Sequence, residues 1–183
     1  MFLAFLIFAS SLSPKAEASV PQPREVQIAW EYKNFPGKIE LYEVTPKYRY
    51  AISTTGTTSS LERAPVTGKK ISDQLRILPG ESKTFVLVVR NPSPDRWFFF
   101  ASPHLMDPPE ASQGHHFECL CIHHIFEVPP KKLWYRIVRL NLSPDFSASQ
   151  AKLVHTVIGV PESEALTTHK KELFFKPKKG GKS

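Results

Sequence analysis

The sequence lacks the motifs that mark common hydrolases and nucleotide-binding enzymes. It contains no G-x-S-x-G elbow, no H-E-x-x-H zinc motif and no glycine-rich phosphate loop. A nucleophile pair of Cys121 and His123 would lack the third, orienting group that such catalysis normally uses. We therefore expect that the protein is not an enzyme, and a thiol- or metal-dependent enzyme is the least favoured alternative.

Convincing helical segments are also scarce, because 17 prolines stand against 8 glycines and β-forming residues occur in short clusters between turns. The clusters predict strands at residues 25–32, 38–44, 48–53, 74–81 (ending in a Pro-Gly turn), 84–90, 97–101, 115–124, 133–142, 153–160 and 171–175, with loops at 54–60 and 102–114. In the first strand, Val26, Ile28 and Trp30 share one face. This pattern predicts an all-β fold, an immunoglobulin-like antiparallel β-sandwich over residues 25–176.

The hydrophobic run near the start is short. Residues 2–9 are apolar but too few to span a bilayer, and Ala16-Glu17-Ala18 follows as a cleavage-type signal. We expect residues 1–18 to be a signal peptide of an exported protein in the periplasm or a membrane-facing intermembrane compartment. No basic residue precedes the run, so a truncated membrane anchor stays an alternative. Residues 19–24 are then a linker.

Acidic residues do not balance the basic ones, and the net charge is +7. Part of the excess lies in the tail at residues 177–183, which contains Lys178, Lys179 and Lys182. No aromatic-rich basic face accompanies the tail, so we expect no nucleic-acid partner. The tail is typical of a solvated terminus or of a contact with an anionic membrane.

Cysteine is rare, and both copies lie in one segment, residues 114–124, together with four of the seven histidines. Cys119 and Cys121 are separated by one residue. On a strand their Cα atoms would lie roughly 6.5–7 Å apart, at the limit for a disulfide. An unstrained bridge between them is therefore not expected.

Strand periodicity divides this segment into two faces. Leu120 and Ile122 are the natural core-facing pair, which turns the cysteines outward. Two thiolates on one face suit Cu(I), which accepts few soft ligands, whereas zinc would also need the histidines of that face. The predicted metal ligands are Cys119, Cys121, His123 and His115, with copper as Cu(I); His116 and His124 fall on the opposite face.

Other interpretations of these residues stay open. Free cysteines behave as small hydrophobic residues, so the alternative is an exported β-sandwich binding or adaptor protein with structural cysteines. His104 and Met106 form an H-x-M pair that copper can use, although a surface histidine beside a core methionine is more common. His155 and His169 are isolated in the sequence and are interpreted as structural.

The order of features resembles the CtaG family, the copper chaperones of cytochrome c oxidase assembly. Cys119-Leu120-Cys121-Ile122 resembles the C-F-C-F copper motif of that family. Upstream, Pro79-Gly80-Glu81 and Asn91-Pro92-Ser93 resemble its P-G-E and N-P-[ST] turns, and the resemblance extends over residues 75–175. This chain departs from the family at His123-His124, where an acidic pair is expected, and it lacks the methionine expected in the following strand.

The resemblance implies an immunoglobulin-like sandwich in which Cys119 and Cys121 bind Cu(I). It also implies a function, delivery of copper to a subunit of a membrane oxidase or to another copper-accepting protein, with contact to the membrane. A homodimer that shares copper between chains is a further implication left open. The resemblance gives no support to His115 and His123 as metal ligands, and their prediction rests on strand geometry alone.

Overall fold

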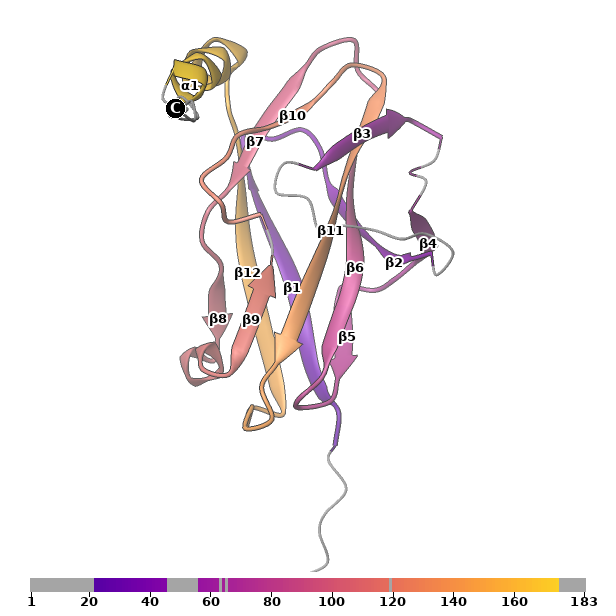
Figure 1. Ribbon diagram of the computed structural model, residues 1–183, viewed down its shortest axis with the longest axis vertical. Helices are drawn as coiled ribbons and strands as arrows, with labels where there is room; N and C mark the ends of the chain where they lie inside the picture. Colours follow the sequence, from indigo (N-terminus) through magenta and orange to yellow (C-terminus); the bar gives the residue numbers. More distant parts are fainter. Residues whose placement is uncertain (1–21, 46–55, 63, 65, 119, 175–183) are drawn as a thin grey trace, which may run out of the picture.

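In the computed structural model the chain folds into two β-sheets that pack face to face (Figure 1). The structure describes residues 22–45, 56–62, 64, 66–118 and 120–174. The predicted signal peptide, the predicted strand at 48–53, Cys119 and the basic tail lie outside the described residues.

The first sheet has the order β10-β7-β12-β1-β5, and β8 also pairs with β12. Its strands are β1 (Arg24–Lys33), β5 (Gln74–Ile77), β7 (Trp97–Ala101), β8 (Leu105–Asp107), β10 (Phe126–Val128) and β12 (Gln150–Gly159). The pairing of β1 with β12 is parallel and the other ladders of this sheet are antiparallel. The predicted all-antiparallel pairing is therefore wrong for the two strands at the centre of the sheet.

The second sheet has the order β3-β11-β6-β2-β4, and β9 also pairs with β11. Its strands are β2 (Ile39–Val44), β3 (Thr57–Ser60), β4 (Thr67–Lys70), β6 (Ser82–Asn91), β9 (His115–Glu118) and β11 (Lys132–Leu142). Every ladder of this sheet among the described residues is antiparallel.

An apolar core fills the space between the sheets. Val26 and Ile28 of β1 are fully buried, as their alternation predicts. The rings of Phe99, Phe126 and Trp134 pack against one another with centroids 5.1 to 5.3 Å apart, joining strands of both sheets. The predicted all-β sandwich is therefore confirmed.

The turn at Pro79-Gly80 is also confirmed. Gly80 has φ of +85°, a conformation that residues with a Cβ rarely adopt, and the Glu81 N–H donates to the Leu78 carbonyl at 3.0 Å. The turn joins β5 in one sheet to β6 in the other.

Three local predictions are wrong. Residues 57–60 form β3, and the loop at 102–114 contains β8 and a 3₁₀ turn, Pro109–Ser112. The strand predicted at 171–175 is instead the end of α1, Glu162–Phe174, which follows Pro161 and begins with Glu162 and Glu164 near the positive end of its dipole. Over the described residues, no helix has the length and apolar character needed to cross a membrane.

A substitution at Gly159 can test how closely β12 approaches the chain at the end of β1. A Cβ built at this position would collide with the backbone carbonyl of Asn34, which cannot move without displacing the chain after β1. We expect Gly159→Ala to lower the free energy of unfolding by about 1–3 kcal/mol, as overpacking typically does. Urea unfolding measures this, with the exposed Ser147→Ala as the control. An unchanged midpoint for Gly159→Ala would contradict the close approach.

Candidate metal centre

The site begins with His155, which occupies an inward position of β12. Its neighbours on that face are Ala151, Leu153 and Val157, and all of these side chains are buried. His155 is 0% exposed. In the parallel ladder it lies opposite Trp30, and the two rings stack with centroids 5.0 Å apart and an angle of 20°. The ladder and the indole together fix the orientation of the imidazole.

His104 reaches the same place from the other side of β12. It directly precedes β8, whose first residue, Leu105, pairs with Val154 in an antiparallel ladder. Continuing that register by one residue brings His104 beside His155, and their ring centroids are 5.1 Å apart. The His104 side chain is half-buried.

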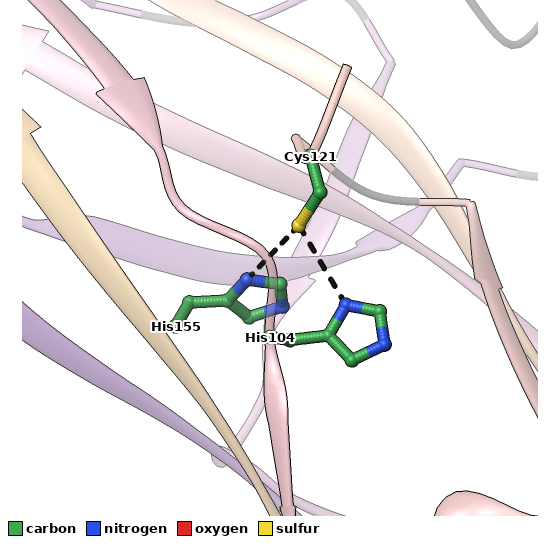
Figure 2. Close-up of side chains that lie close together, drawn as sticks. All are labelled: His104, Cys121 and His155. Atoms are coloured by element: carbon green, nitrogen blue, oxygen red, sulfur yellow. Dashed lines mark hydrogen bonds between the residues drawn. The ribbon is translucent and has the colours of Figure 1, made fainter. Parts of the chain in front are cut away.

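Cys121 lies in the segment between β9 of the second sheet and β10 of the first. Strand β9 ends at Glu118, and the Ile122 N–H donates to the Leu120 carbonyl at 2.9 Å, a tight turn centred on Cys121. Leu120 is 0% exposed and anchors this turn in the core. Figure 2 shows the sulfur of the half-buried Cys121 pointing between the two imidazole rings.

The three side chains offer one sulfur and two nitrogens to a common point. Cys121 Sγ lies 3.5 Å from His155 Nδ1 and 3.6 Å from His104 Nδ1, and the three atoms all lie within 4.8 Å of one another. A tetrahedral metal with ordinary thiolate and imidazole bond lengths separates such ligands by about 3.6 Å. The group His104, Cys121 and His155 could therefore hold a metal ion.

His115 contacts this group at its edge. Its Nε2 lies 3.2 Å from Nε2 of His104, on the far side of that ring from the nitrogen that faces Cys121. Burial lowers the pKa of His115, the nearby His104 imidazole lowers it further, and backbone carbonyls oppose the shift only in part. A neutral His115 can accept a hydrogen bond from His104 Nε2–H, which would fix the tautomer that points Nδ1 at an ion.

The prediction that Cys121 faces outward and Ile122 faces the core is wrong. Period-two alternation ends with β9, because the chain turns and His123 adopts φ of +53°. Ile122, predicted to face the core, is 38% exposed, and Cys121 points inward. His123 is exposed and is not one of the three converging residues. The ligand roles of Cys119 and His123 stay predictions.

His155 is the site residue that the sequence interpretation missed. Its signal was present, because it replaces an apolar residue in the alternation Ala151, Leu153, Val157 of a predicted strand. Among the described residues the core contains few buried polar side chains, so a fully buried histidine is informative. His104 joins the site, whereas its predicted partner Met106 is part of the apolar core.

Replacing His155 separates a structural role from a metal-binding role. We expect apo His155→Leu to be within about 1 kcal/mol of the wild type, because an apolar side chain of similar size replaces a buried polar one. We also expect Zn²⁺, used as a redox-silent probe, to raise the Tm of the wild type and not of this variant. The exposed His116→Leu is the control and should keep the Zn²⁺ shift.

These results come from thermal unfolding of the reduced protein with and without Zn²⁺. A loss of about 3 kcal/mol or more in apo His155→Leu would instead make the imidazole a structural element of the core. An equal Zn²⁺ shift in the wild type and in His155→Leu would place the metal elsewhere.

Comparison with curated proteins and with solved structures gives no match. A family model described as "Domain of unknown function (DUF8709)" matches residues 24–160. The match runs from the first residue of β1 to just beyond the end of β12, so it covers both sheets and the three converging side chains. Since it also covers well over half of the sequence, the chain belongs to the DUF8709 family.

Proposed function

We propose that this protein is a copper chaperone that binds one Cu(I) ion at His104, Cys121 and His155 and passes it to another protein. The observation that carries the proposal is the convergence of Cys121 Sγ with the Nδ1 atoms of both histidines at 3.5 and 3.6 Å. The three ligands come from three separate segments: His104 directly precedes β8, Cys121 lies between β9 and β10, and His155 is in β12. The fold, and not a local motif, therefore brings them together.

The donor set favours copper over other metals. Thiolate is a soft ligand that suits copper and zinc, and imidazole suits both as well. A structural zinc site normally has four protein ligands, and three converge here among the described residues.

The surroundings of the site favour transfer over permanent storage. His104 and Cys121 are only half-buried, and the residues that directly follow them are exposed apolar side chains. Leu105 is 72% exposed and Ile122 is 38% exposed. Exposed apolar residues beside a metal site fit contact with a partner protein.

The recipient is proposed from the resemblance to the CtaG family. It is a copper-accepting subunit of a membrane oxidase during cytochrome c oxidase assembly, reached by an exported form of this protein. Within this proposal Cys121 supplies the thiolate that is essential for binding, and Cys119 is dispensable for affinity.

The test is a competition titration of the reduced protein with a chromogenic Cu(I) chelator. We expect one equivalent of Cu(I) in the wild type and a loss of affinity of at least about 100-fold in Cys121→Ser and in His155→Ala, because each removes a direct ligand. His116→Ala is the control for loss of an exposed histidine, and Cys119→Ser for loss of a neighbouring thiol. Equal Cu(I) affinity of the wild type and Cys121→Ser would refute the proposal.

A further inference from the structure

We infer that the same site is a one-electron redox centre, which cycles bound copper between Cu(II) and Cu(I). The inference rests on the proposed copper site and adds an electron-transfer function to it. Its basis is the donor set and the rigid surroundings of His104, Cys121 and His155.

The donor set can serve both oxidation states of copper. One thiolate with two imidazoles in a trigonal arrangement is the ligand set of copper centres that transfer single electrons. Cys121 Sγ lies almost equally far from the two Nδ1 atoms, at 3.5 and 3.6 Å. Ordinary bond lengths give about 3.6 Å for tetrahedral and about 3.8 Å for trigonal coordination, so this spacing lies close to both. The sulfur–nitrogen distances therefore suit either oxidation state.

A backbone carbonyl lies beside the thiol of the ligand group. The Ser102 carbonyl oxygen lies 3.2 Å from Cys121 Sγ and accepts a hydrogen bond from the thiol. Its position is fixed, because the Ser102 N–H donates to the carbonyl of Thr156, the residue after His155, at 2.9 Å. A backbone oxygen is one of the weak axial ligands that tune trigonal copper sites.

The packing around the ligands resists rearrangement when the charge on copper changes. His155 is 0% exposed and stacked on Trp30, and the ring of Phe117 lies 5.6 Å from His155 and 6.1 Å from His104 between centroids. Phe117 is itself 6% exposed and stacked on Phe85 of the core. Densely packed interiors of this kind hold side chains in single positions.

The electron transfer needs no bond to form or break. Cu(II) bound to the Cys121 thiolate and two neutral imidazoles accepts one electron from an outer-sphere one-electron reductant and becomes Cu(I) with the same three ligands. A one-electron oxidant reverses the step, and no proton is gained or lost by the ligands. His104 and Cys121 are both half-buried, so the ligand group is in part accessible to an outer-sphere electron donor.

The experiment uses protein loaded with one equivalent of Cu(I), oxidised by ferricyanide and reduced by ascorbate. We expect oxidation to produce an intense visible absorption from thiolate-to-Cu(II) charge transfer and a Cu(II) paramagnetic resonance signal. Ascorbate should abolish both, and repeated cycles should restore them without loss of copper. The visible band should be absent in Cys121→Ser and retained in Cys119→Ser, which cannot form a disulfide between the two cysteines.

The outcomes separate this inference from the proposed function. One equivalent of bound Cu(I) that is released on oxidation, or Cu(II) with only weak absorption, overturns the redox role and leaves the chaperone proposal standing. Loss of both thiols on oxidation of the wild type, with no charge-transfer band in Cys119→Ser, overturns it in the same way. Failure of the wild type to bind Cu(I) in the competition titration refutes the proposed function itself.

Discussion

Strand β12 is the element on which the candidate site depends, because it pairs with different strands along its two edges. On one edge the parallel ladder with β1 places Trp30 opposite His155. On the other edge the antiparallel ladder with β8 ends where His104 meets His155. The two ladders thus set the backbone positions of His155 and Trp30 and of Leu105, the residue after His104. The third ligand, Cys121, reaches them from the segment between β9 of the opposite sheet and β10.

A metal bound at this point would link three separate segments of the chain and change the energetics of the fold. In the apo protein the core position at His155 holds a polar ring where its strand neighbours are apolar, which makes the interior less stable than an all-apolar one. An ion that binds only the folded protein adds stability through mass action, by about 2.7 kcal/mol at a free concentration 100 times Kd. With such coupling, the free energy of unfolding would depend on the metal supply while the fold stays the same.

The fold was largely predictable from the sequence because its signals are local. Alternation marks β1, and continuous apolar runs mark β6 and β11. The site was less predictable because its contacts join residues far apart, such as Cys121 and His155. The tight turn at Cys121, followed by a positive φ at His123, interrupts an alternation that the sequence pattern continues through this segment. The parallel pairing of β1 with β12, which supplies Trp30, likewise joins distant parts of the chain.

X-ray absorption fine structure at the copper edge of the Cu(I)-loaded, reduced wild-type protein tests the central claim most directly. The arrangement of His104, Cys121 and His155 predicts one sulfur and two nitrogen ligands for each copper ion. Two sulfur ligands would mean that Cys119 and Cys121 chelate the metal together, and no sulfur ligand would remove Cys121 from the site; either result contradicts the account.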